Sequence, residues 1–265
     1  MSVRAVTRRR IVKGLGGSII ALILMVQIVP IALIILFSFN ATARLSFPFG
    51  GFSTRWYAAA FTQPGFHEAF SNSLIAALAT AVISGTAGFL AAFALQRVRL
   101  RARTVAESAI GLPNITPPLL IGVGLSLLTQ ALGIRKSIDS VVAGHVIVAL
   151  PFVFGVMRSK VAQFDFSIVD AARDLGASRS RAFFDITLPL MRTSMVSAGL
   201  MAAALSMDEF IVTSFTRGTL DTVPTLAFGL LRRGVDPTIN AMATMVLAGT
   251  LALAWSALVI SRKEP

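Results

Sequence analysis

The chain alternates between long apolar segments and short polar ones, and this alternation is its strongest pattern. A helix needs about 20 predominantly apolar residues to cross a bilayer. Six segments without Asp, Glu, Lys or Arg approach or reach that length, and they are 19–37, 74–95, 112–132, 140–157, 193–207 and 241–260. The fifth then meets Asp208 and Glu209 and is apolar again as far as Phe215. The pattern predicts an all-α membrane protein with six transmembrane helices.

The first apolar run follows a basic stretch, as the apolar region of a secretory signal peptide does. However, the run covers 15–39, which exceeds the 7–15 residues of such a region, and no small-residue cleavage pattern follows it. We therefore predict a retained first helix. The predicted parts are a basic tail at 1–14, the first transmembrane helix at 15–39, an outer loop at 40–72, a core of five spans at 73–260 and a tail at 261–265. The core includes a cytoplasmic loop at 158–192.

The charges indicate how the spans are oriented. The chain carries 24 Lys and Arg against 12 Asp and Glu, a net charge of +12. With both termini in the cytoplasm, 17 of the 24 basic residues fall in inner segments and 7 in outer ones, as the positive-inside rule requires. This distribution accounts for the basic composition without nucleic acid. A nucleic-acid site would need a clustered basic patch with stacking residues, and the chain has a single tyrosine.

The composition removes several kinds of active site. There is no cysteine, and no P-loop, nucleophile-elbow or H-E-x-x-H motif is present. His67 and His145 are too far apart in the sequence to form a short metal-binding motif. We therefore expect no catalytic residue, no metal site and no cofactor-binding site in this chain. His145 lies within the fourth span, where we expect it to hydrogen-bond a neighbouring helix.

The cytoplasmic loop is the most patterned polar stretch. Ile168, Ala171, Ala172 and Leu175 follow one another at the spacing of one helical face. A helix with such a small apolar face can rest on lipid or dock on another protein, and the pattern alone does not choose between them.

The ends of this loop helix also carry sequence signals. Ser167, with Asp170 three residues later, approximates a capping box at its start. Gly176 follows the last periodic residue, where a left-handed conformation commonly ends a helix. A second short helix is expected to begin at Ser178.

The loop resembles the EAA loop of permease subunits of bacterial ABC importers. Asp170-Ala171-Ala172 is followed by Gly176 and, after nine intervening residues, by Ile186-Thr187-Leu188-Pro189, which is the family spacing. Asp170 stands where the family usually has Glu, one methylene longer. The resemblance implies the ABC importer permease fold with a cytoplasmic coupling helix that docks on an ATPase. The positions that it assigns to coupling are Ile168, Asp170, Ala171, Ala172, Leu175, Gly176, Phe183, Leu188 and Pro189.

The same resemblance implies partners and a location. ATP and Mg would belong to a dimer of separate ABC ATPase chains. A second homologous permease would complete the pathway, and an extracytoplasmic substrate-binding protein would deliver the substrate. The chain would be a transport subunit, not an enzyme, embedded in the lipid of the bacterial inner membrane with both termini in the cytoplasm.

A second stretch is similar to permeases of the spermidine/putrescine type. Ser206-Met207-Asp208-Glu209-Phe210 and the later run 234–244 carry this similarity. It implies a pathway for polyamines or similar small amine cations. Importers of opines, aminophosphonates, other small amines and ferric ions share parts of the pattern and remain alternatives.

The acid pair in the fifth span is the candidate substrate pathway. A charged side chain at the bilayer centre costs about 3 kcal/mol on insertion scales, so it normally faces a cavity or a partner. On a continuous helix, Asp208 and Glu209 would point about 100° apart, so we expect one of them to face the pathway. Ser206 is expected to line the same path. The alternative is that the acids pair with Arg217 or with another chain.

Two functions of a different class remain, a self-assembling channel and a membrane scaffold. The patterned cytoplasmic loop disfavours the channel, which needs no docking helix. The acids in the fifth span disfavour the scaffold.

Overall fold

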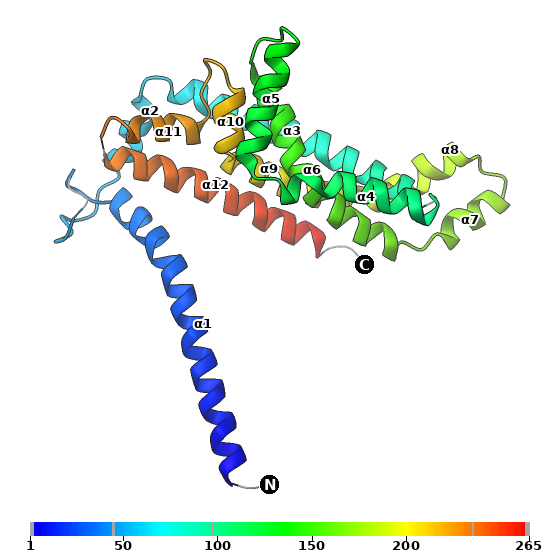
Figure 1. Ribbon diagram of the computed structural model, residues 1–265, viewed down its shortest axis with the longest axis horizontal. Helices are drawn as coiled ribbons and strands as arrows, with labels where there is room; N and C mark the ends of the chain where they lie inside the picture. Colours follow the sequence, from blue (N-terminus) through cyan, green and yellow to red (C-terminus); the bar gives the residue numbers. More distant parts are fainter. Residues whose placement is uncertain (1–2, 44–45, 97, 235, 263–265) are drawn as a thin grey trace. The chain divides into compact units, whose positions relative to one another are not determined.

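The computed structural model describes residues 3–43, 46–96, 98–234 and 236–262 and, within them, is built almost entirely of helices (Figure 1). The elements are α1 (Val3–Ser38), α2 (Arg55–Thr62), α3 (Phe66–Leu95), α4 (Leu100–Ile115), α5 (Pro118–Ala131), α6 (Ile138–Gln163), α7 (Ser167–Asp174), α8 (Arg179–Ala182), the π-helix η1 (Phe183–Thr187), α9 (Leu188–Asp208), α10 (Ile211–Thr216), α11 (Val223–Leu231) and α12 (Pro237–Ser261). The all-α prediction is confirmed. The chain divides into two units, residues 1–63 with 230–244 and residues 64–229 with 245–265.

Among the described residues, five helices are long and apolar enough to cross a membrane, and a bent pair of helices makes a sixth span if it is counted as one. The six predicted spans map onto α1, α3, the pair α4–α5, α6, α9 and α12. The helices extend beyond the predicted apolar cores at one or both ends. For example, α3 begins at Phe66, inside the segment predicted as the outer loop.

The first unit contains α1 and a folded segment after it. From Ser18 to Ser38, α1 exposes nearly all of its apolar side chains within this unit. The segment that follows is organised around Asn40, whose side-chain oxygen accepts hydrogen bonds from the backbone N–H groups of Thr42 and Gly50. Trp56 of α2 donates its indole N–H to the Asn40 carbonyl at 2.6 Å. These contacts make the first part of the predicted outer loop an ordered turn.

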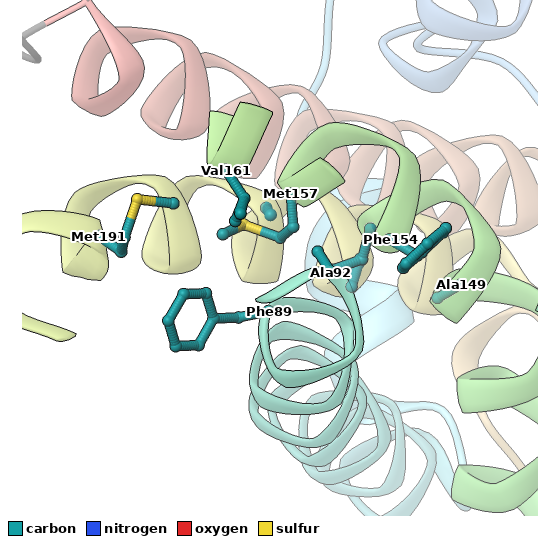
Figure 2. Close-up of a cluster of buried hydrophobic side chains, with 10 residues drawn as sticks. Phe89, Ala92, Ala149, Phe154, Met157, Val161 and Met191 are labelled. Carbon is teal, nitrogen blue, oxygen red and sulfur yellow. The ribbon is translucent and has the colours of Figure 1, made fainter. Parts of the chain in front are cut away.

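The second unit has α3, α6 and α9 at its centre. Figure 2 shows where the three helices meet, with Phe89 and Ala92 from α3, Met157 from α6 and Met191 from α9 among the buried side chains. Lipid tails are as apolar as these residues, so close packing rather than removal from water holds such helices together. The buried face of α9 consists mostly of Ala, Ser and Gly, which lets the neighbouring backbones approach closely.

The third predicted span is not one helix. Its first residues, up to Ile115, belong to α4, and α5 leaves α4 at an angle of 103°. Pro117 causes the break, because the residue before a proline is driven out of the helical conformation. Thr116 accordingly has φ −90° and ψ 126°. The prediction of a continuous helix at 112–132 is therefore wrong at its start.

The fifth predicted span is also interrupted. α9 ends at Asp208, Glu209 is extended with ψ 104°, and α10 starts at Ile211. The expectation that Asp208 and Glu209 follow one another on a continuous helix is wrong, because Glu209 lies outside it.

Candidate functional site: the cytoplasmic loop and the break in the fifth span

The loop helix α7 begins differently from the sequence expectation. Ser167 is its first residue instead of its cap. The carboxylate of Asp165 accepts a hydrogen bond from the Ser167 backbone N–H at 2.9 Å. Hydrogen bonds from the side chain and backbone of Ser167 hold the pKa of Asp165 below its usual value. Asp165 therefore accepts the hydrogen bond at the start of α7, a role that the sequence had assigned to Ser167 and Asp170.

The end of α7 agrees with the prediction. Gly176 has φ +93°, in the left-handed region. Its N–H donates to the carbonyl of Arg173 at 2.9 Å, and the next N–H, of Ala177, donates to the carbonyl of Ala172 at 3.0 Å. This pair of bonds is a Schellman motif, which satisfies carbonyls that the end of a helix leaves free. α8 then starts after Ser178, whose hydroxyl accepts from the Arg181 N–H at 3.2 Å.

The predicted apolar face of α7 points away from the rest of the unit. Ile168 is 48% exposed and Leu175 is 90% exposed, and Ala171 is exposed as well. The buried residue of α7 is Val169, which is not part of that face. The helix thus packs against α8 and η1, with Val169 buried, and leaves most of its predicted docking face uncovered within the described residues, with Ala172 half-buried.

Aromatic rings attach the loop to the bundle. The ring of Phe183, the first residue of η1, stacks on Phe89 of α3 at 6.0 Å and lies 5.2 Å from Phe93. Phe166, just before α7, lies 6.2 Å from Phe93. Leu188 packs against the buried cluster of Figure 2 where α9 begins, and Pro189 occupies the first turn of that helix. The loop therefore contacts α3 through these rings and continues directly into α9.

The candidate acids lie at the other end of α9. Asp208 is exposed, and no hydrogen bond or ion pair of its carboxylate occurs among the described residues. Glu209 is half-buried and its Oε1 accepts from the Val212 backbone N–H at 2.9 Å, which satisfies the first turn of α10. The alternative pairing with Arg217 does not occur in this chain, because Arg217 bonds to Asp221.

Ser206 is buried at the same break. Its hydroxyl lies 2.6 Å from Nδ1 of His145, and Nε2 of His145 lies 2.7 Å from the hydroxyl of Thr213. The expectation that His145 bonds a neighbouring helix is confirmed, and it bonds to two helices. The sequence had left open whether Thr213 lines the path or joins two helices, and in the structure its hydroxyl bonds to His145 of another helix.

Sequence reasoning also missed an ion-pair network at the end of α6. Glu107 of α4 accepts from Arg103 at 2.8 Å and from Arg158 at 3.2 Å. Glu107 and Arg103, which lies four residues before it, could have been paired from their spacing alone. The second arginine comes from a distant part of the chain and had no sequence signal.

The predicted coupling and pathway residues are thus separated by the length of α9, which is about 30 Å for its 21 residues. No group of three or more His, Asp or Glu that could hold a metal ion occurs in the part of the chain that the structure describes. A bundle of apolar helices long enough to cross a bilayer, with an exposed loop helix at one end of α9 and a broken span at the other, indicates a multi-pass membrane protein.

Comparison with known proteins identifies the class further. Residues 84–263 match the family model described as the inner membrane component of binding-protein-dependent transport systems, and the chain belongs to this family. It is therefore a multi-pass inner membrane transport subunit, as the sequence predicted.

The chain is 30% identical over 237 residues to the spermidine/putrescine transport system permease protein PotC of Escherichia coli strain K12, covering 89% of each. It is 33% identical over 226 residues to the putrescine transport system permease protein PotI of the same strain, covering 82% of this chain and 80% of PotI. A chain of a bacterial ABC transporter that imports the acidic polysaccharide alginate shares the fold, with a TM-score of 0.65, 16% identity and 97% coverage of each chain.

Proposed function

We propose that this chain forms half of the translocation pathway of an ABC importer for polyamines or similar small amine cations. The relatives named for spermidine and putrescine support this substrate class. The observation that carries the proposal is the carboxylate of Asp208, which stands exposed at a break in an apolar span without a partner among the described residues. In surroundings of low dielectric, a fixed negative charge attracts an amine cation and repels anions.

The two acids have different roles in this proposal. Glu209 uses one carboxylate oxygen to satisfy the N–H of Val212, so it shapes the backbone at the break. Asp208 is the acid that faces the substrate. Ser206 contributes to the same path from its buried position beside His145.

ATP hydrolysis is assigned to a separate ATPase dimer that holds ATP and Mg. It would dock on the exposed face of α7, where Ile168 and Leu175 stand uncovered and Asp170 is accessible. A second, homologous permease would complete the pathway, and a substrate-binding protein would deliver the amine from outside. Both termini would lie in the cytoplasm, as the distribution of basic residues favours.

The test of the substrate class is uptake of labelled putrescine and spermidine by the importer reconstituted in vesicles. Asp208→Asn removes the charge and keeps the shape, and we expect it to reduce uptake about tenfold or more. Glu68→Gln, which neutralises another exposed acid at the start of α3, is the matched control and should transport normally. Normal uptake by Asp208→Asn would remove this acid from the mechanism. Uptake of an opine, an aminophosphonate or ferric ion in place of the polyamines would contradict the substrate class and leave the family unaffected.

A further inference from the structure

The break in the fifth span is bridged by one side chain from the fourth. His145 of α6 is only 2% exposed. Its Nδ1 lies 2.6 Å from the hydroxyl of Ser206, in α9 before the break, and its Nε2 lies 2.7 Å from the hydroxyl of Thr213, in α10 after it. One imidazole ring therefore ties together the two helices that the break separates.

The direction of each hydrogen bond follows from counting protons. The hydroxyl of Thr213 donates to the carbonyl of Glu209 at 2.7 Å, and a hydroxyl has one proton to give. It must accept from His145, so the ring carries its proton on Nε2. Nδ1 is then the acceptor, and Ser206 donates to it. The chain of bonds runs from Ser206 through a neutral His145 and Thr213 to the backbone of Glu209, and every member is satisfied.

The packing around α10 supports the same role. A Cβ on Gly144, the residue before His145, would overlap the side chain of Val212. A Cβ on Gly122 of α5 would lie 3.2 Å from Val212 Cα and 3.0 Å from Phe215 Cδ2. α10 thus packs closely against α5 and α6, and this packing leaves α10 little room to move relative to α6.

The close packing of α10 also restricts the positions of Asp208 and Glu209 at the break. The carbonyl of Glu209 bonds to Thr213 and its carboxylate bonds to the N–H of Val212, so both polar groups of Glu209 are directed into α10. Asp208 is the residue immediately before it. Because Glu209 is held to α10, the backbone after α9 can leave that helix in only one direction. The orientation of the neighbouring Asp208 carboxylate is thereby set as well.

We propose that His145 is a positioning residue of the transport path, which locks α9 to α10 across the break and so orients Asp208. His145 touches neither the substrate nor the carboxylate of Asp208, and it acts through Ser206, Thr213 and the backbone of Glu209. The transport part of this inference rests on the proposed function. The locking part does not, because it is a statement about the distance between two helices.

The locking part is tested by spin labels across the break. Because the chain has no cysteine, labels can be placed at Leu205→Cys and Ser214→Cys without removing any native thiol. Both positions are exposed, one in α9 and one in α10. In the full importer complex we expect a narrow distance distribution for the labelled parent. Adding His145→Ala or Thr213→Val should broaden it, and Thr213→Ser, which keeps the hydroxyl, should restore it.

Matched variants separate locking from general packing. Thr216 is a buried threonine of the same short helix, but its hydroxyl bonds only to the Val212 carbonyl of its own turn. Ser197 is a buried serine of α9 whose hydroxyl has no hydrogen-bond partner among the described residues. Thr216→Val and Ser197→Ala should leave the distance distribution narrow, in contrast to Thr213→Val and Ser206→Ala.

The transport part is tested with the same variants by putrescine uptake. His145→Ala, Ser206→Ala and Thr213→Val should raise the KM for putrescine about tenfold, and the two control variants should keep the parent value. An unchanged distance distribution in Thr213→Val and Ser206→Ala would overturn the lock, whether or not His145→Ala assembles. A broadened distribution with a parent-like KM would overturn the link from the lock to Asp208. If all variants of Asp208 transport normally as well, the proposed function fails while the lock stands.

Discussion

The two ends of α9 differ in which of their groups are exposed and which are satisfied within the chain. At its start, η1 and α7 are attached by stacked aromatic rings, and α7 turns an apolar face with Ile168 and Leu175 outward. At its end, the backbone is broken, yet the polar groups around Glu209 are satisfied inside the chain by Val212 and Thr213. One end exposes apolar side chains, and the other satisfies its polar groups within the chain and leaves the Asp208 carboxylate exposed.

The difference shows what each end has to tolerate. A loop that lies outside the bilayer can leave its backbone groups to water, so its sequence is free to present a docking face. Irregular backbone at membrane depth is tolerated only where protein or a water-filled cavity satisfies it. At the break, the Glu209 carboxylate accepts from the Val212 backbone N–H, and the Thr213 hydroxyl donates to the Glu209 carbonyl, so side chains of the protein meet this requirement. α9, buried along its small residues, connects the two ends as a stiff rod about 30 Å long.

The largest expected effect is a difference in labelling between the two ends of α9, because they are predicted to lie on opposite sides of the membrane. One end should be labelled from outside the cell and the other should not. A single cysteine at Ser180, in the loop, should not react with an impermeant thiol reagent applied to intact cells. A single cysteine at Thr219, beyond the break, should react. Both positions are exposed, so accessibility within the chain does not limit either reaction. Labelling of the Ser180 position from outside would contradict the six-span orientation.

The next effect concerns the backbone at the loop end. Gly176→Val places a β-branched residue at φ +93°, which is strained, although a Cβ there meets nothing within 4 Å. We expect uptake to fall about tenfold, because α7 can no longer end where it does. Gly176→Asn is the matched control, since Asn tolerates the left-handed region better, and it should retain most of the activity. Equal loss in both variants would mean that something other than backbone conformation matters at this position.

A smaller effect is expected from the exposed face of α7. Leu175→Ser should weaken retention of the ATPase on purification roughly threefold, because it removes an apolar contact of the size that a single interface leucine provides. Leu100→Ser, at an 81% exposed leucine of α4, serves as the control. If both variants retain the ATPase equally, the loop helix rests on lipid and the docking role has to be abandoned.

The smallest effect concerns the start of α7. The pKa of Asp165 is lower in the folded chain than in the unfolded one, so its contribution to stability is present above the unfolded pKa and is lost as the pH falls through the folded value. Asp165→Ala should increase amide hydrogen exchange of the first turn of α7 by about twofold at neutral pH and remove the acid-dependent part of that exchange. Exchange that is identical in parent and variant across the acid range would show that Asp165 does not hold this end.

Much of the fold could be predicted because length and apolarity suffice to locate membrane helices. The two breaks within the predicted spans differ in how clearly the sequence signals them. The break before α5 was signalled by Pro117, whose effect on Thr116 is local. The break after Asp208 carries no proline or glycine, and the two helices beside it are joined through His145, far along the chain, so no comparable local signal marks it in the sequence.

The site was predictable to a similar extent. The face of α7 and the left-handed Gly176 follow from spacing and local conformation, which the sequence encodes directly. The cap at Asp165 was missed because two neighbouring side chains, Asp165 and Ser167, compete for one helix start and only the backbone conformation decides between them. The partner of Ser206 was missed because His145 is 61 residues away.

The π-helix η1 has a consequence for how this chain can be altered. Its hydrogen bonds reach back five residues, as from the Leu188 N–H to the Phe183 carbonyl, so the turn holds one residue more than an α-helix would. Because this turn already accommodates the extra residue, deleting one residue from 183–187 would let it close as an α-helical turn and leave the direction of the segment before it nearly unchanged. Deleting one residue from the regular part of α9 would instead turn everything before it, including the face of α7 that carries Ile168, by about 100° around the axis of α9. For anyone grafting this loop into another permease, the π turn between Ala182 and Leu188 is therefore the place where the residue count can change by one without redirecting α7.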